Sequence, residues 1–279
     1  MSTSSPTDDN PPPGPGPSKG DLIRRGAYKT NVAGVLTFVG LRGLEPLLQY
    51  QLLRPGGWGT ALLTRLNLSA IPSSALPLAT LFGTTLPLPL PNLVLVSMSA
   101  AASLKQIFWL LAIGREELGP GASAAVGIFN GAFNSLNALL FLWSATSPFS
   151  SFSTSLGLPL PAPMLAGAAL FTLGIALETL PEIQRKRFKE NPANKGKVCD
   201  AGVWGWVRHP NYGGYALWRT GYALAAGGLA FGLVMGVWQM WHFATDSVVF
   251  MDEYMQKRYG EQWEGHKKRV RWLLVPGIY

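Results

Sequence analysis

A short polar stretch with the side chains for ligand chemistry stands directly before a long apolar run. From Gly202 to Tyr215 the chain reads GVWGWVRHPNYGGY. Its aromatic, charged and amide side chains are Trp204, Arg208, His209, Asn211 and Tyr212. Guanidinium, imidazole, amide and phenol groups in one place can bind an anionic ligand that also has an aromatic part. The stretch is therefore predicted to form the cytoplasmic edge of a cofactor site.

A basic pair lies upstream of this stretch. Arg185 and Lys189 are four residues apart, so they share a face if the preceding apolar helix continues beyond the membrane edge. Such a pair can hold a phosphate group. Gly202 and Gly205 bracket Trp204, as a backbone requires where it turns tightly near a flat ligand. A positive-inside loop followed by an interfacial aromatic belt would use the same residue types, but their order favours a ligand site.

The composition identifies the elements that must position these residues. The chain has 279 residues, of which 48% are hydrophobic and 14% charged, and its mean hydropathy is +0.18. Apolar runs of about 20 residues recur, so we expect an all-α, polytopic membrane bundle of about six helices. The net charge of +8 comes from short basic blocks between these runs, which membrane orientation and anionic headgroups explain. We therefore expect no nucleic-acid partner. The single cysteine, Cys199, excludes a multi-cysteine metal site, and no metal is expected.

The apolar runs divide the chain into three predicted regions. A disordered, Pro-rich cytoplasmic tail spans 1–29, membrane helices on the substrate side span 30–160, and a cofactor-binding membrane region spans 161–279. The expected spans are 31–53, 92–114, 122–146, 163–180, and two short helices within 212–250 that meet near Gly227 and Gly228. The Pro-rich segment 54–91 is expected to be extended or re-entrant. With six spans, every basic block lies on the cytoplasmic side.

Two segments of the C-terminal third also match a known pattern. The sequences EIQRKRFKENPANKGKVCDAGVWGWVRHPNYGGY and QKRYGEQWEGHKKRVRWLLVPGIY occur in this order between residues 178 and 279. This region resembles the C-terminal region of the steroid 5-alpha-reductase and sterol carbon-carbon double-bond reductase superfamily. The resemblance implies a membrane reductase, located in the endoplasmic reticulum, that passes hydride from NADPH to a double bond of a lipophilic, sterol-like or enone substrate. Isoprenylcysteine carboxyl methyltransferases and phospholipid methyltransferases share a related R-H-P-x-Y core.

The resemblance also implies which residues bind the cofactor. They are Arg185, Lys189, Trp204, Arg208, His209, Asn211, Tyr212, Arg258, Tyr259 and His266. Tyr212 and Glu178 are the catalytic candidates. The sequence does not choose a proton donor among Tyr28, Tyr50, Tyr212, Tyr215, Glu45 and Glu178. The chain departs from the pattern where Tyr215 replaces an acid, where His266 replaces a tyrosine, and where Phe250-Met251-Asp252 replaces R-D-E. These departures leave open an altered cofactor network or a lost activity.

Polar residues within the spans are candidates for the substrate end. Asn130, Asn134 and Asn137 fall at i, i+4 and i+7, hence on one helix face. Amides in hydrocarbon are costly unless they face partners or a cavity, so they either bond between helices or line a substrate cavity. Glu178, at the end of a span, is either functional or paired with Lys105 or Arg219. Arg219 itself either snorkels to the membrane surface or extends the cofactor site.

Three functions remain open from the sequence. The first is the NADPH-dependent reductase of a lipophilic substrate in the bilayer. The second is an S-adenosylmethionine-dependent methyltransferase, because Asp252-Glu253 stands where such enzymes tend to carry paired acids. The third is a non-catalytic membrane protein that retains the fold. The sequence leaves the oligomeric state open.

Overall fold

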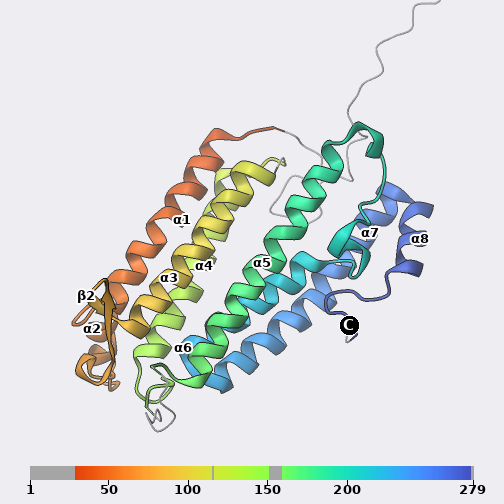
Figure 1. Ribbon diagram of the computed structural model, residues 1–279. Helices are drawn as coiled ribbons and strands as arrows, with labels where there is room; N and C mark the ends of the chain where they lie inside the picture. Colours follow the sequence, from red (N-terminus) through yellow and green to blue (C-terminus); the bar gives the residue numbers. More distant parts are fainter. Residues whose placement is uncertain (1–28, 115, 151–158, 278–279) are drawn as a thin grey trace, which may run out of the picture.

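A bundle of long helices forms the body of the protein. The computed structural model describes residues 29–114, 116–150 and 159–277. The long helices are α1 (Val32–Leu53), α3 (Leu90–Phe108), α4 (Pro120–Leu142), α5 (Ala162–Glu190) and α6 (Pro210–His242), and they lie side by side (Figure 1). The predicted helical fold is confirmed. The predicted tail spans residues 1–29, and all of it except residue 29 lies outside the described residues.

Four helical segments of the described chain are long and apolar enough to cross a membrane. They are Leu90–Ile113, Pro120–Leu142, Ala162–Glu190 and Pro210–Tyr259. The predicted count of six spans is therefore not confirmed. Helix α1 is long enough, but Arg42, Glu45 and Gln49 lower its hydropathy. The segment Pro210–Tyr259 is one of these four candidate spans, although the chain reverses direction within it.

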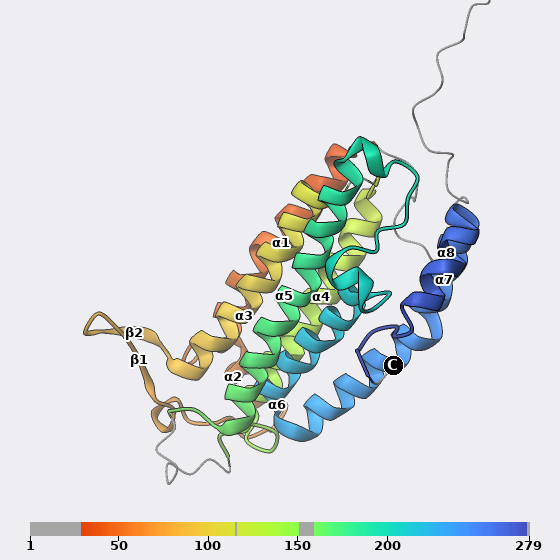
Figure 2. The same cartoon turned by 45° about the vertical axis from the view of Figure 1, so that its right-hand side comes forward.

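This reversal occurs at Gly228 inside α6. Gly228 has φ 71° and ψ −169°, a conformation that is open essentially to glycine alone. A Cβ atom added at Gly232 would lie 2.8 Å from Leu224, and one at Gly236 would lie 3.3 Å from Thr220. The second half of α6 therefore packs antiparallel on the first half, as Figure 2 shows. The predicted hinge near Gly227 and Gly228 is confirmed.

Helix α5 and the first half of α6 pack with their backbones in close contact. Gly167 of α5 lies against Gly221 and Ala225 of α6, where an added Cβ would be 2.5 Å from backbone atoms of both. Gly174 of α5 and Gly214 of α6 make similar approaches, each about two turns along its helix from the first contact. Small residues allow such approaches between membrane helices, where dispersion contacts replace the hydrophobic driving force.

The Pro-rich segment 54–91 lies at the opposite end of the bundle from α7 and α8 (Figure 2). It contains α2 (Trp58–Arg65) and an antiparallel hairpin of β1 (Leu78–Leu81) and β2 (Thr84–Pro89). The prediction of extended chain is confirmed for the hairpin and wrong for α2. The segment 58–65 has no internal proline, so nothing there interrupts helical hydrogen bonding.

The C-terminal region is built on an extension of α5. This helix continues ten residues past the predicted span end at Leu180, to Glu190, with Pro181 inside it. A loop then leads to the short 3-10 helix η5 (Gly202–Gly205), and α7 (Val248–Tyr259) and α8 (Glu261–Arg269) follow α6. Figure 1 shows α7 and α8 on the same side of the bundle as the end of α5. The basic segments after α5 and α7 are thereby brought together.

Candidate active site

The polar stretch is held in place by the end of α5 and by the chain after α8. The indole of Trp204 is buried in η5 and donates from Nε1 to the Pro181 carbonyl at 2.7 Å. The backbone amides of Arg208 and His209 donate to the carbonyls of Trp272 and Leu273, each at 2.9 Å. Pro210 then begins α6, a position at which its missing N–H costs nothing. Two segments that are distant in sequence thus form one unit.

Gly202 explains why this unit can form so close to α5. Its φ of 59° is in the left-handed region. An added Cβ would lie 2.7 Å from Oε1 of Gln184, a side chain that accepts a hydrogen bond from the amide of Val203 at 3.3 Å. The predicted tight turn beside Trp204 is confirmed at this glycine.

Aromatic rings connect the polar stretch with Phe243, the residue that directly follows α6. The His209 ring stacks on Tyr212 at 5.4 Å, and Tyr212 stacks on Phe243 at 5.0 Å with an interplanar angle of 3°. Tyr215 meets Phe243 edge-on at 5.6 Å. The stack positions the phenol of Tyr212 inside the α6 hairpin, while Asn211 lies half-buried in the first turn of α6.

Asp252 of α7 links the predicted cofactor residues to the C-terminal helices. It accepts from Nε1 of Trp263 at 2.8 Å and from Nζ of Lys267 at 3.4 Å, and lies 4.0 Å from Nη1 of Arg208. Trp263 in turn stacks on His266 at 5.1 Å. The predicted residues Arg208, His209, Tyr212 and His266 are therefore brought together. Trp263 was missed by sequence reasoning, although it is the tryptophan of the tail motif.

The basic pair of α5 is on one helix, but its two members contact different partners. Arg185 pairs with Glu182 at 2.6 Å and lies 5.4 Å above the Trp204 ring. Lys189 donates to the Tyr259 hydroxyl at 2.9 Å and to the Lys197 carbonyl. Arg258 contacts the Tyr254 hydroxyl and lies 5.6 Å from the Tyr259 ring. Each basic group thus already has a protein partner, and in the part of the chain that the structure describes no common partner joins Arg185 to Lys189.

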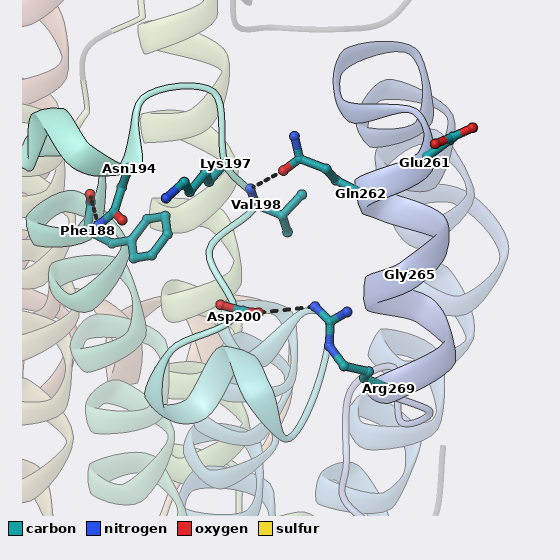
Figure 3. A pocket seen from close by; sticks show the side chains of 9 residues that line it. All are labelled: Phe188, Asn194, Lys197, Val198, Asp200, Glu261, Gln262, Gly265 and Arg269. Atoms are coloured by element: carbon teal, nitrogen blue, oxygen red, sulfur yellow. Dashed lines mark hydrogen bonds and ion pairs between the residues drawn. The ribbon is translucent and has the colours of Figure 1, made fainter.

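A groove lies next to the contact between Lys189 and Tyr259. Its volume is about 410 Å³, and it separates the loop after α5 from α8 (Figure 3). The residues that line it are Phe188, Asn194, Lys197, Val198, Asp200, Glu261, Gln262, Gly265 and Arg269. Asp200 and Arg269 form an ion pair at 3.1 Å across one end of the groove. None of the predicted cofactor residues lines it.

Several buried polar atoms at this end of the molecule have no hydrogen-bond partner within residues 29–114, 116–150 and 159–277. They are Oε1 of Glu182, Nε2 of His209, Oε1 of Gln256 and Nδ1 of His266. A buried polar atom left unpaired costs about 1–3 kcal/mol, and native proteins contain few of them. Their concentration beside Arg208 and Asp252 fits a site that binds a polar ligand.

The titration of His209 provides a test of this packing. Burial, together with the charge of Arg208 and opposed by Asp252, lowers the pKa of His209 to about 4. The unfolded chain therefore binds more protons between about pH 6.5 and pH 4, so stability falls as the pH falls through this window. The loss attributable to His209 is about 3 kcal/mol, at 1.36 kcal/mol per pKa unit.

We expect His209→Gln to reduce this dependence. The measurement is the midpoint of thermal unfolding in detergent, followed by tryptophan fluorescence from pH 7 to pH 4. The variant's midpoint should fall less steeply than that of the unchanged protein. Equal slopes would contradict the assignment of the titration to His209.

The predicted residues of the membrane helices form contacts deeper in the bundle. Glu178 forms an ion pair with Lys105 of α3 and accepts from Nε1 of Trp218 at 2.7 Å. The predicted pairing with Lys105 is thus confirmed, and both carboxylate oxygens are occupied. Asn130, Asn134 and Asn137 are all buried on one face of α4, which confirms the predicted face. Asn130 and Asn134 form hydrogen bonds to other helices, in agreement with the first of the two alternatives for these residues, bonding between helices or lining a substrate cavity.

Comparison with known proteins places these features in a family. The family described as "Protein of unknown function (DUF1295)" matches residues 132–270. The chain is 36% identical to the "Probable O-methyltransferase ustE" of Ustilaginoidea virens over 261 residues, which are 91% of this chain and 90% of that protein.

Sterol reductases match part of the chain. The "Delta(14)-sterol reductase" of Neurospora crassa is 28% identical over 162 residues, 42% of this chain and 33% of its own length. The "Delta(14)-sterol reductase erg24" of Schizosaccharomyces pombe is 28% identical over 165 residues, 53% of this chain and 38% of its own length. The chain thus spans well under half of these reductases.

Proposed function

This chain belongs to the DUF1295 family of steroid 5-alpha-reductase-like membrane proteins, and we propose its function from that premise. We propose that the protein is a membrane-embedded reductase that binds NADPH at the Arg208-His209 end of α6 and acts on a carbon-carbon double bond of a lipophilic substrate. The sterol reductases among its relatives support this chemistry. An endoplasmic reticulum location, with the cofactor entering from the cytoplasm, is part of the same proposal.

The observation that carries the proposal is the group of unpaired buried atoms beside the R-H-P-N-Y motif. His209 is 4% exposed and His266 1%, yet Nε2 of the first and Nδ1 of the second lack partners. Burial lowers the pKa of both rings, so both are neutral at pH 7, and each of these nitrogens can donate or accept according to its tautomer. Ribose hydroxyls and the nicotinamide amide are ligand groups that such nitrogens satisfy.

The charged and aromatic residues then have distinct roles. NADPH, when bound, supplies the hydride. Arg208 and Arg185 provide positive charge for its phosphates, and Trp204 packs beneath the Arg185 guanidinium. Asp252 orients Arg208 through their 4.0 Å contact. Tyr212 is the favoured proton donor, because it lies in the aromatic stack that leads into the bundle, whereas Glu178 is already bonded to Lys105 and Trp218.

A methyltransferase is the second candidate. The relative with 91% coverage of this chain is named a probable O-methyltransferase. In addition, Arg185 and Lys189, the predicted phosphate pair, are each bonded within the protein. S-adenosylmethionine carries no phosphate and would not need them.

Cofactor titration separates the two candidates. We expect the purified protein in detergent to bind NADPH saturably and to bind S-adenosylmethionine at least tenfold more weakly, measured by quenching of tryptophan fluorescence. Arg208→Ala removes a charge-assisted contact, worth about 1.5–3 kcal/mol, and should weaken NADPH binding at least tenfold.

Arg65→Ala, an exposed arginine at the end of α2, is the matched control and should leave the affinity unchanged. Saturable binding of S-adenosylmethionine alone would establish the methyltransferase. Binding of neither cofactor would favour a non-catalytic protein.

A further inference from the structure

Two arginines and one glutamate are enclosed at mid-length of the helices. Arg42 and Glu45 of α1 form an ion pair, and the exposed fractions of Arg42, Glu45 and Arg219 are 0%, 3% and 2%. Glu45 also accepts from Ser99 of α3 at 3.1 Å and from Asn134 of α4. The helices α1, α3, α4 and α6 thus all contribute to one polar centre.

Asn134 connects the two arginines. Its amide nitrogen donates to Glu45, and its oxygen accepts from Nη1 of Arg219 at 3.1 Å. Arg219 donates further to Asn130 and to the Tyr215 hydroxyl, the latter at 3.2 Å. Arg42 lies within electrostatic reach of Arg219. The chain of contacts runs from Arg42 through Glu45 and Asn134 to Arg219.

The charge of this centre is not balanced. Two guanidinium groups and one carboxylate leave a net charge of +1, and within the described chain no second carboxylate contacts either arginine. The nearby pair of Lys105 and Glu178 is neutral in itself. Arginine stays protonated in proteins, and an uncompensated charge away from water costs several kcal/mol. The centre therefore calls for a monoanion.

Arg42 also has the donors to hold one. Its Nη1 atom contacts Glu45. Its Nε and Nη2 atoms are inaccessible to solvent and have no hydrogen-bond acceptor among the described residues, so two donor groups remain for an anion. A carboxylate is a monoanion whose two oxygens match the fork of a guanidinium.

The centre is joined to the proposed cofactor site by the aromatic stack. Tyr215, whose hydroxyl accepts from Arg219, meets Phe243 edge-on at 5.6 Å, and Phe243 stacks on Tyr212. Tyr215 is the residue that replaces the acid of the family pattern. A tyrosine at this position adds no negative charge to the centre, so the arginines remain available to a ligand.

We propose that Arg42 and Arg219 form an anion site that binds the carboxylate of a lipophilic acid, and that this acid is the substrate class. The assignment of this acid as the substrate rests on the proposed function, whereas the binding of the carboxylate does not. The carboxylate itself occupies the centre with or without a cofactor. The neutral part of the molecule lies among the helices, along the rings of Tyr215 and Phe243.

The test measures ligand-induced stabilisation of the full chain in a neutral detergent without any cofactor. Two acids of different shape, oleic acid and lithocholic acid, are compared with their methyl esters. At least one acid should raise the unfolding midpoint saturably, and its ester should not. Arg42→Gln and Arg219→Gln should weaken the apparent affinity of that acid at least tenfold.

Two further variants keep the result interpretable if a glutamine variant folds poorly. Arg219→Lys retains the charge and should retain part of the response, and the exposed Arg65→Gln should respond like the unchanged protein. The inference is overturned if neither acid exceeds its ester, or if the response survives in both glutamine variants. Because this experiment contains no cofactor, a failure of the protein to bind NADPH would not affect the stabilisation by acids. A failure of the acids to stabilise the protein would likewise not affect the NADPH titration.

Discussion

Glu45→Gln is expected to lower the free energy of unfolding by about 3–5 kcal/mol, the cost of removing one partner from a buried ion pair. The substitution leaves Arg42 fully buried beside Arg219 and raises the enclosed charge from +1 to +2. Glutamine keeps the size of the side chain, so that loss of charge rather than loss of packing is measured. The unfolding midpoint in detergent micelles, followed by tryptophan fluorescence, reports the change.

Two comparisons isolate the cause of this loss. Glu190→Gln removes a carboxylate from an exposed pair with Lys186 at 3.6 Å, where the expected cost is below about 1 kcal/mol. Arg42→Gln neutralises the centre and should destabilise less than Glu45→Gln does. If Glu45→Gln unfolded at the same midpoint as the unchanged protein, Arg42 would have a counterion other than Glu45.

Features with a local cause could be predicted from the sequence. The reversal near Gly227 and Gly228 follows from an apolar run too long for one span, broken by two glycines. The common face of Asn130 and Asn134 follows from helical periodicity. Arg185 and Lys189 can share a helix face only if α5 continues past Leu180, and the helix does continue. In each case the residues concerned lie within a few turns of one another.

Apart from the pairing of Glu178 with Lys105, one of two partners named from the sequence, the partners of the charged residues could not be predicted in this way. Arg219 was given two roles, snorkelling or cofactor binding, and the structure turns it inward to asparagines that are 85 and 89 residues distant in sequence. Arg42 and Glu45 are three residues apart, but their burial depends on α3 and α4 packing over them. Sequence spacing identifies such residue types and leaves their tertiary contacts open.

The basic pair of α5 illustrates the same limit within the candidate site. Sequence spacing correctly places Arg185 and Lys189 on one helix, yet it does not reveal that Glu182 occupies the first and Tyr259 the second. Whether a phosphate displaces these partners depends on the strength of the two contacts. The contact of Lys189 with Tyr259 is exposed, whereas Glu182 in the contact with Arg185 is buried. The buried atoms of His209 and His266 are consequently a better guide to the ligand than the basic pair.

Gly221→Leu is expected to prevent the α5 and α6 helices from packing. A Cβ atom at this position would lie 2.5 Å from the Phe171 amide nitrogen and 2.6 Å from the Gly167 carbonyl oxygen. Both are backbone atoms of α5, so no side-chain rotation relieves the clash and the helices must separate. Overpacking a core commonly costs about 1–3 kcal/mol, and two backbone clashes at the most extensive helix contact should exceed this.

Gly40→Leu is the matched control, because Gly40 lies mid-helix in α1, exposed, with no atom within 4 Å of an added Cβ. The measurement is the yield of monodisperse protein in detergent, together with its unfolding midpoint. We expect Gly221→Leu to lose most folded protein and Gly40→Leu to retain it. Separation of α5 from α6 would also break the contact of Trp218 with Glu178 and move Arg219 away from Asn134. Folded Gly221→Leu protein at normal yield would mean that the close approach of these helices is not required for the polar centre.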